Sequence, residues 1–249
     1  MTTLTPVIPA AVRDEERVVR IAAGGSAVIL LLPPGGLPQV LHWGADPGPL
    51  NANDLRELNR STQRGVSPRA LDEPWPLTVL PTEADGWAGR PGLLAQRGSE
   101  LVIPDWQDFS VELRGDTLTY RATSQQIAFD YSLKIDDAGL VHLQQGITNL
   151  GTQPMALQAL EATMPVGSLA HEVLDFTGRW TRERVPQRTR LTQGSNVRES
   201  RRGRTGHDSP FLLVLGTPGF THRAGEVWAT HLAWSGDSIY PESTGRPLT

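Results

Sequence analysis

The sequence predicts an all-β fold, a sandwich of large antiparallel sheets with a few short helices, and three observations support this prediction. Hydrophobic and polar residues alternate from residue 109 to residue 164, as they do along strands with one buried face. The 20 prolines and 25 glycines divide the 249 residues into short segments, which many short strands require. Only residues 51–60 have a plausible helical pattern.

The middle of the chain predicts a β-meander, in which each strand pairs with the next. Its strands are expected at residues 109–113, 118–122, 127–135, 140–150 and 155–164. Residues that favour chain reversal separate these strands, such as Gly115-Asp116 and the run from Asp136 to Gly139. The alternation is uninterrupted, so this meander forms the centre of the predicted fold.

The flanks of the meander add further strands and one helix. Strands are expected at residues 17–22, 26–32, 38–43, 211–215 and 226–234. The helix at 51–60 is expected to begin with Asn53 or Asp54 as its N-cap and to place Leu55 and Leu58 on one side. No repeat or long linker divides the chain. Residues 1–249 are therefore predicted to form a single domain, with flexible ends at 1–15 and 237–249.

Charge and composition exclude several classes of function. The net charge of -4 argues against nucleic acid or an anionic membrane as the main partner. The chain has no cysteine, which excludes disulfides and thiolate metal sites. The first twenty residues lack the basic and apolar regions of a secretory signal, and the longest apolar run, 27–32, is far shorter than the ~20 residues of a membrane span. We therefore expect a cytoplasmic protein.

The sequence also lacks the common motifs for nucleotides, metals and nucleophilic catalysis. Neither a Walker-type glycine loop nor a G-x-G-x-x-G run is present, and there is no G-x-S-x-G elbow. The six histidines never have H-x-H or H-x-x-x-H spacing. We therefore expect no cofactor and no metal site.

Arginine is concentrated in one segment, where nine arginines accompany two acidic residues, Glu183 and Glu199, between residues 179 and 204. Basic clusters can neutralise phosphates, but Trp180 is the only aromatic residue here and the whole chain is acidic. An exposed loop or β-hairpin with scattered charges is a second interpretation. We favour a third, a polar surface that meets another subunit or domain through forked guanidinium hydrogen bonds.

The seven tryptophans are many for a chain with 6% aromatic residues. Indole faces can stack on sugar C–H surfaces, but packing in a core or interface explains many tryptophans equally well. Trp228 and Trp234 lie in strand-like sequence and are expected in the core. Trp87 and Trp180 lie in loop-like sequence rich in glycine and arginine, so they are better candidates for a ligand or an interface.

Three motifs in the last third of the chain occur in an order that is specific to one family. They are GRWTRER at 178–184, ESRRGRTGHDSPF at 199–211, and GEVW at 225–228 followed by SG at 235–236. Earlier segments agree, namely HWG at 42–44, RGVSP at 64–68, LPTE at 80–83 and GWAGRPG at 86–92. The chain resembles the amino-terminal domain of the bacterial α-galactosidases of glycoside hydrolase family 36, from about residue 40 to residue 236.

This resemblance implies a β-supersandwich related to galactose mutarotase. The family enzymes remove terminal α-linked galactose by a retaining mechanism, which requires two carboxyl groups about 5–5.5 Å apart. In the family both carboxyls come from a (β/α)₈ barrel that follows this domain, and the barrel's motifs are absent from these 249 residues. We therefore expect no catalytic residue here, and no hydrolysis by this chain alone.

The resemblance implies a supporting role instead. Family enzymes are typically homo-oligomers in which loops of this domain reach the aglycone side of a neighbouring active site, and an aspartate and an arginine after the HWG-like strand are implicated. Asp54 and Arg64 are the best matches, although helix capping by Asp54 and a surface role for Arg64 explain them equally well. Trp87, Arg90 and Trp180 are the other candidates for the substrate side or the interface.

Two other functions stay open from the sequence. The chain could be a stand-alone carbohydrate-binding module that uses Trp87 or Trp180. It could also be a mutarotase-like sugar epimerase, which needs a His/Glu acid–base pair. His171 and Glu172 are adjacent, but neighbours on a strand point to opposite faces and do not converge. The expected partners are an α-galactoside, the catalytic barrel and a second copy of the chain.

Overall fold

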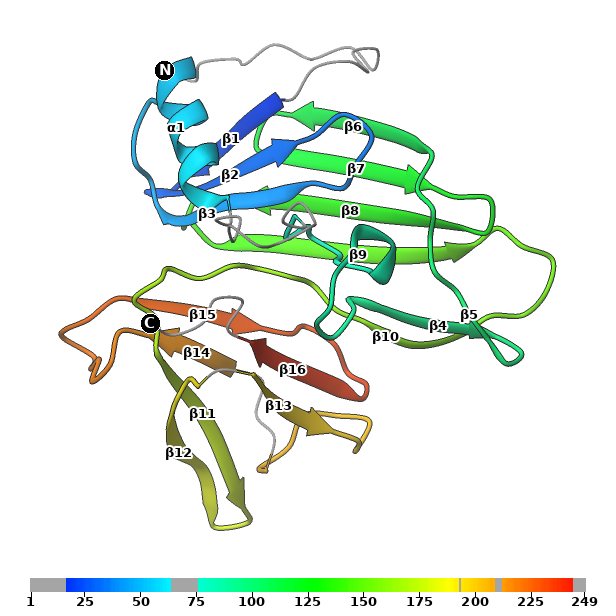
Figure 1. Ribbon diagram of the computed structural model, residues 1–249. Coiled ribbons are helices and arrows are strands. Elements are labelled where there is room, and N and C mark those ends of the chain that lie inside the picture. The colour runs from blue at the N-terminus through cyan, green and yellow to red at the C-terminus, as the bar shows by residue number, and fades with distance from the viewer. Residues whose placement is uncertain (1–16, 64–75, 193, 209–211, 244–249) are drawn as a thin grey trace, which may run out of the picture. The chain divides into compact units, whose positions relative to one another are not determined.

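The computed structural model describes residues 17–63, 76–192, 194–208 and 212–243. These residues form sixteen strands, one α-helix and one 3₁₀-helix (Figure 1). All strand pairs are antiparallel, so the all-β prediction is confirmed. The chain divides into two compact units, Met1–Pro165 (unit 1) and Val166–Thr249 (unit 2). The prediction of a single domain over the whole chain stays a prediction.

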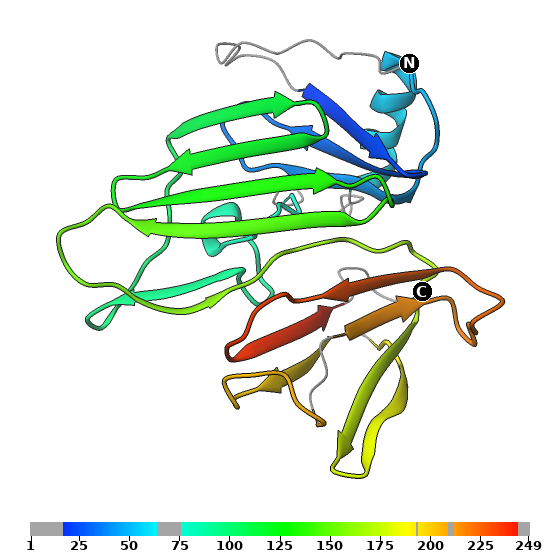
Figure 2. The ribbon, with the colours of Figure 1, turned by 180° about the vertical axis from the view of Figure 1, so that it is seen from behind.

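Unit 1 is built around two facing sheets, which Figures 1 and 2 show from opposite sides. The first sheet has the order β1-β2-β3, and its strands are β1 (Arg17–Ala23), β2 (Ser26–Leu32) and β3 (Gln39–Ala45). The second is the predicted meander, with strands β6 (Asp108–Arg114), β7 (Thr117–Thr123), β8 (Ile127–Ile135) and β9 (Val141–Asn149). Each of these seven strands lies within two residues of its predicted bounds.

The alternation of the sequence explains how the two sheets pack. Val28 and Leu30 of β2 share one apolar cluster with Leu118 of β7 and with Phe129 and Leu133 of β8. All five side chains are buried completely. Removing a side chain of this size from water stabilises the fold by about 1.5–3 kcal/mol. The core of unit 1 therefore lies between β1–β3 and β6–β9.

Strand β2 is buried on both faces, because the helix α1 (Ala52–Thr62) covers the outer side of its sheet. Leu55 and Leu58 of α1 pack on Ile29 and Leu31, the residues of β2 that point away from the main core. Figure 1 shows α1 lying across β1–β3. The predicted apolar side of the helix is therefore confirmed, and it explains why β2 is almost entirely hydrophobic.

The predicted N-cap of this helix is wrong. Asn51 is the N-cap, and its side chain accepts hydrogen bonds from the backbone N–H groups of Asn53 and Asp54 at 2.8 and 3.1 Å. The Asp54 carboxylate returns a bond by accepting from the Asn51 N–H at 2.9 Å. This reciprocal capping box places the N-cap three residues before Asp54. Since Asn51, Asn53 and Asp54 are all good caps, residue type did not distinguish them.

A small third sheet completes unit 1 and was not predicted in full. Its order is β10-β4-β5, with strands β4 (Leu93–Arg97), β5 (Glu100–Leu101) and β10 (Ala156–Leu160). Strand β10 ends four residues earlier than expected. After it, the Glu161 N–H donates to the Gly92 carbonyl at 2.7 Å, and this bond ties the chain to the loop before β4.

Unit 2 consists of a four-stranded sheet and a two-stranded ribbon. The sheet has the order β12-β11-β14-β15, with strands β11 (Glu172–Arg179), β12 (Arg182–Arg190), β14 (Leu212–Gly216) and β15 (Val227–His231). The ribbon pairs β13 (Ser195–Ser200) with β16 (Ser238–Ser243). Val173, Leu191 and Leu213 form a buried apolar cluster, against which Leu215 and Tyr240 pack.

Unit 2 corrects two expectations and decides between two alternatives for a third segment. Ser238–Ser243 form a strand where the sequence suggested a flexible end. Strand β15 ends at His231, so Trp234 lies outside it and is 62% exposed instead of in the core. Residues 179–190 of the arginine-rich segment belong to the β11–β12 hairpin, one of the two structures expected for this segment. Its charged strand β12 is exposed at all nine positions, so it lacks the apolar alternation that identifies a half-buried strand.

Candidate functional site

The segment 82–92 of unit 1, here called the Trp87 loop, positions two of the predicted site residues. Thr82 precedes the 3₁₀-helix η1 (Glu83–Asp85), and its N–H and hydroxyl both donate to the Asp85 carboxylate, at 3.3 and 3.0 Å. Gly86 then adopts φ 78°, a left-handed conformation that glycine favours. These features reverse the chain immediately before Trp87.

The Trp87 side chain is held by its own loop. Its indole N–H donates to the carbonyl of Arg90 at 2.8 Å. The ring lies over Gly89 so closely that a Cβ there would be 2.9 Å from three ring atoms. Glycine at position 89 is therefore required for this ring position. The indole is partly exposed, so it is both fixed in place and accessible on one side.

Arg90 is fixed by an ion pair with the end of β10. Its Nε donates to Glu161 Oε1 at 2.6 Å, with the side chains 34% and 9% exposed respectively. Burial raises the pKa of Glu161, and the hydrogen bond from Arg90 opposes this rise. Because the Glu161 carboxylate is paired with the Arg90 guanidinium, Glu161 acts to position Arg90. The loop thus presents an indole and a guanidinium in a defined arrangement.

Of the other two site residues predicted in this part of the chain, Asp54 lies among the described residues, and it is not part of this loop. Asp54 is exposed in the first turn of α1, where its carboxylate serves the capping box. Among the described residues, the hydrogen bonds of Asp54 are those it exchanges with Asn51 in the capping box. Arg64 lies outside the described residues. Helix capping accounts for Asp54, and its proposed role near substrate stays a prediction.

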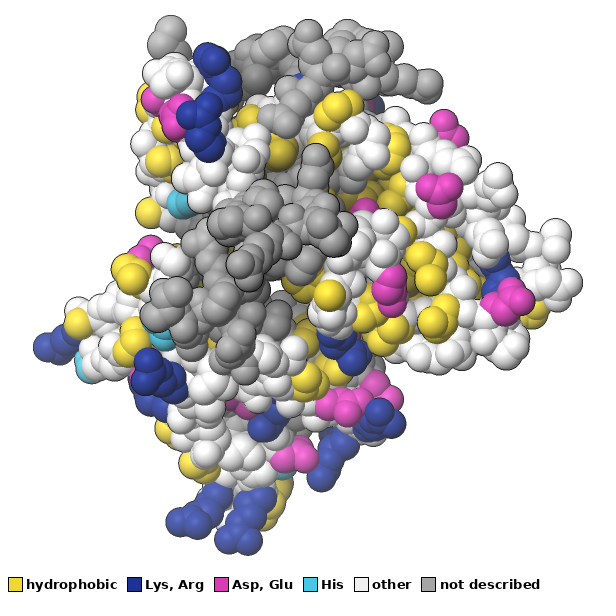
Figure 3. All heavy atoms as spheres, viewed as in Figure 1, with side chains coloured by type: hydrophobic (Ala, Val, Ile, Leu, Met, Phe, Trp, Pro, Cys, Tyr) yellow, Lys and Arg dark blue, Asp and Glu magenta, His cyan; other side chains and the backbone are white. Residues whose placement is uncertain are grey.

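Trp180 lies at the turn between β11 and β12 in unit 2, and 76% of it is exposed. Its ring meets His207 edge-on, with the centroids 5.8 Å apart and the planes at 82°. Thr181 in the same turn has φ 68°, an unusual conformation for a residue other than glycine. Figure 3 shows Lys and Arg side chains at the end of this hairpin. The turn therefore presents an aromatic ring among positive charges.

Ion pairs hold several arginines of unit 2 in place. Within the described residues these pairs are Arg188 with Glu172, Arg198 with Asp175, Arg201 with Glu199, and Arg202 with Asp208. Arg188 also lies 4.4 Å above the centre of the Phe220 ring, a favourable cation–π position. Part of the predicted partner surface is thus committed to contacts within unit 2.

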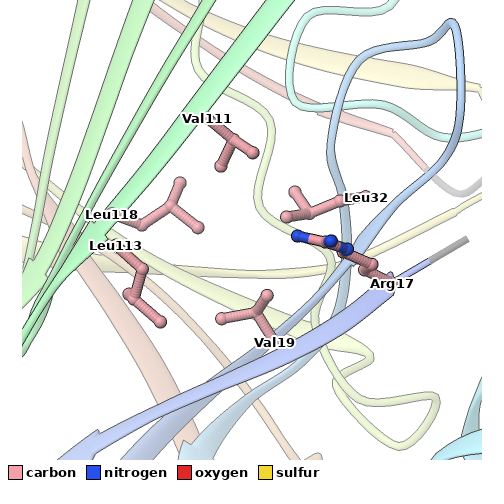
Figure 4. Close-up of a pocket in the computed structure, with 6 residues that line it drawn as sticks. All are labelled: Arg17, Val19, Leu32, Val111, Leu113 and Leu118. Atoms are coloured by element: carbon pink, nitrogen blue, oxygen red, sulfur yellow. The ribbon is translucent and has the colours of Figure 1, made fainter. Parts of the chain in front are cut away.

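The described part of the chain contains no cluster of three or more His, Cys, Asp or Glu side chains that could hold a metal ion. Its helices include none that is long and apolar enough to cross a membrane. A small opening between β1–β2 and β6–β7 is lined by apolar side chains and by Arg17 at its rim (Figure 4). This opening is a gap in the sandwich core with no paired polar groups, so it suggests no chemistry.

The fold and these residues define an antiparallel β protein whose surface carries the Trp87 loop and an arginine-rich hairpin. The family model of the glycosyl hydrolase family 36 N-terminal domain matches residues 36–240. The chain belongs to this family.

Similarity to individual proteins agrees with this assignment. Over 203 residues the chain is 36% identical to an α-galactosidase of Escherichia coli, and the match covers 80% of this chain and 28% of that protein. The crystal structure of the family 36 α-galactosidase AgaA from Geobacillus stearothermophilus is similar with a TM-score of 0.72 and 17% identity, covering 91% of this chain and 35% of that one.

A second solved structure, the α-galactosidase from Lactobacillus brevis, gives a TM-score of 0.74 at 16% identity, covering 94% of this chain and 35% of that chain. These structural similarities establish the shared fold. The chain therefore spans about a third of the length of the relatives that it matches.

Sequence reasoning proposed Trp87 and Arg90 as candidates, which they remain, but missed the residues that hold them in place. Gly89 and Glu161 are separated from each other by seventy-two positions, and no local pattern relates Glu161 to the loop. The available signal was the glycine-rich GWAGRPG run, which indicates that a bulky side chain closely approaches backbone. The acidic partner of Arg90 could be identified only from the structure. Glu161 follows β10, and the pairing of β10 with β4, which brings it to the loop, is not visible in the sequence.

Proposed function

We propose that this chain is the amino-terminal part of an α-galactosidase, and that it supports oligomer assembly and the aglycone side of the active site. The observation that carries the proposal is the family match over residues 36–240, together with 36% identity to the Escherichia coli enzyme. Variants of the similar enzyme AgaA have been crystallised with stachyose and raffinose. We therefore propose terminal α-galactosides of this kind as substrates of the whole enzyme.

The Trp87 loop is the proposed aglycone-side element. An indole face supplies a flat apolar surface for sugar C–H groups, and a guanidinium donates several hydrogen bonds in a fixed geometry to hydroxyl oxygens. Because Gly89 and Glu161 already hold both groups, little side-chain entropy would be lost when a sugar binds. No catalytic role is proposed for this loop, because its acidic partner Glu161 is occupied by Arg90.

A chimera tests this proposal. This chain would replace the matching amino-terminal segment of the Escherichia coli α-galactosidase, and kinetics would be measured with raffinose and with an aryl α-galactoside. Trp87→Ala and Arg90→Ala are each expected to lower kcat/KM for raffinose by about tenfold or more, the loss of about 1.4 kcal/mol of binding. The aryl substrate should change much less, because it lacks the second and third sugars.

Arg114→Ala is the matched control, because Arg114 is an exposed arginine on β6 whose partner is the neighbouring Glu112. This variant should behave like the unmodified chimera. Equal losses for both substrates would contradict an aglycone-side role and indicate a general effect on the fold. No change for either substrate in the Trp87 and Arg90 variants would place the aglycone contacts elsewhere.

The exposure of Trp180 favours a second candidate, a carbohydrate-binding module that acts without the rest of an enzyme. Titration of the 249-residue chain with raffinose, followed by tryptophan fluorescence, tests it against Trp180→Phe. Saturable binding that this variant loses would support the module. The epimerase alternative receives no support. A backbone hydrogen bond from Gly219 and the contact with Arg188 lower the pKa of Glu172, so this carboxylate is a poor proton acceptor.

A further inference from the structure

Unit 2 contains a buried carboxyl group that none of the preceding functions uses. Glu242, on β16, is 5% exposed, and its Oε2 atom has no hydrogen-bond partner in the described structure. Transfer of an ionised carboxylate from water to such a site is costly unless the charge is paired. The surroundings of Glu242 therefore decide whether it carries a charge.

The register of the β13–β16 ribbon determines which groups surround it. Asn196 lies opposite Glu242, and Arg198 lies opposite Tyr240. Residues that are paired, or two apart on a strand, share a face, so these four side chains lie on one face of the ribbon. Tyr240 packs against the apolar cluster of unit 2, which shows that this face is turned toward the β11–β14 sheet.

One cation on this face, Arg198, lies near two carboxyl groups but forms an ion pair with only one of them. Arg198 Nη1 lies 3.0 Å from Asp175 Oδ2 on β11. Its Nη2 donates to the carbonyl of Phe176 at 3.0 Å and to the carbonyl of Asp208. The guanidinium is therefore committed to Asp175 and to backbone oxygens. Asn196 gives Glu242 a neutral hydrogen bond, so no cation pairs directly with it.

We propose that Glu242 is a proton-operated latch, which holds the β13–β16 ribbon on the sheet of unit 2 while its carboxyl is neutral and loosens the ribbon when it ionises. The titratable and charged groups that face it are Asp175 from β11, Arg198 from β13 and Tyr240 from its own strand. Ionisation of Glu242 would place a second carboxylate near the Arg198 guanidinium, which already pairs with Asp175 and donates to two backbone carbonyls.

The direction of the effect follows from the pKa. The pKa of Glu242 is raised from 4.5 to about 7, mainly by burial and also by the charge of Asp175, against the opposing effects of Asn196 and Arg198. Because the folded state holds this proton more tightly than the unfolded state, the stabilisation is fully present below the unfolded pKa of 4.5 and is lost as the pH rises through about 7. The latch is therefore closed in mild acid and open above neutrality.

Hydrogen exchange of the whole 249-residue chain tests the latch. Amide protection of Asn196–Glu199, and of Ile239, Tyr240 and Glu242, would be measured between pH 5.5 and pH 8.5 and corrected for the intrinsic rate. We expect protection to fall by about tenfold or more across this range. Glu242→Gln, which mimics the neutral carboxyl, should remove this pH dependence. Glu226→Gln, an exposed position in the same unit, should leave it unchanged.

A second variant examines the electrostatic cause. Asp175→Asn removes one carboxylate and leaves Arg198 Nη1 available to Glu242, so the midpoint observed by ¹³C NMR of the Glu242 carboxyl should fall by about one pH unit or more. The proposal is wrong if the wild-type Glu242 carboxyl titrates near 4.5, or if Glu242→Gln retains the wild-type pH dependence of exchange. The carboxyl titration decides the matter even if the Asp175 variant is too unstable for exchange measurements.

Discussion

The interiors of the two units are built from different interactions, and the difference determines what each unit is sensitive to. Unit 1 buries a continuous apolar cluster between two sheets, with Phe129 and Leu118 completely inaccessible. Unit 2 has a small apolar cluster around Val173 and places Asp175 and Glu242 beside one arginine. Hydrophobic burial needs only apolar contact, whereas buried charges need specific partners. Unit 1 should therefore respond to changes of volume, and unit 2 to changes of charge and pH.

The largest expected effect is on the core of unit 1. Phe129→Ala should lower the free energy of unfolding by about 3–5 kcal/mol, because it removes a fully buried ring that packs against Trp106 and Tyr131. Urea denaturation of the whole chain measures this loss. A loss below 1 kcal/mol would mean that the apolar cluster of unit 1 does not determine its stability.

The next effect is on the Trp87 loop. Gly89→Ala should cost about 1–3 kcal/mol of local stability, because the new methyl group would overlap the Trp87 ring. Altered tryptophan emission and faster exchange of the loop amides would report the displacement. Ala88→Ser, at an exposed neighbouring position, is the control. Unchanged emission in the Gly89 variant would show that the ring does not rest on this glycine.

Removal of the helix cap should have an intermediate effect. Asn51→Ala deletes the acceptor for two N–H groups at the start of α1, which should cost about 1 kcal/mol. Asn53→Ala is the comparison, because the predicted alternative cap contributes only its backbone N–H to the capping box. Equal losses in the two variants would contradict the observed cap.

The smallest effect is expected at the exposed aromatic turn of unit 2. Trp180→Ala should change the free energy of unfolding of this chain by no more than about 0.5 kcal/mol, because 76% of the residue is exposed. Thermal unfolding would measure it. In the chimera the same change should weaken assembly or activity, as expected for an interface residue. Unfolding of the isolated chain by this substitution would make Trp180 a core residue.

The sequence predicted the fold well wherever burial imposes a period. Strands β1–β3 and the meander β6–β9 were located correctly, because most of these strands alternate toward the core and β2, which is buried on both faces, is a continuous apolar run. Strands β12 and β13 were missed, since β12 is exposed on both faces and β13 is exposed at most positions. These strands are held by backbone hydrogen bonds to their neighbours, and backbone hydrogen bonding does not require any particular order of apolar and polar residues.

The candidate site was predictable only in part. Glycine and tryptophan identified the Trp87 loop, and arginine content identified the hairpin around Trp180. The partners Glu161 and Glu242 were not found, because a lone glutamate has no local signal that it is buried. Both are defined by strand pairing, through β10 with β4 and β13 with β16. Buried acidic residues of this kind can be recognised only when the pairing register of their strands is known.

The most direct test of the proposed function compares three proteins on an aryl α-galactoside. They are the 249-residue chain, the Escherichia coli α-galactosidase without its matching amino-terminal segment, and the chimera that joins the two. We predict no turnover by the first, little by the second, and hydrolysis by the chimera, because the proposed function gives this domain a supporting role and assigns catalysis to the rest of the enzyme. Turnover by the chain itself, or a folded chimera without activity, would contradict the account.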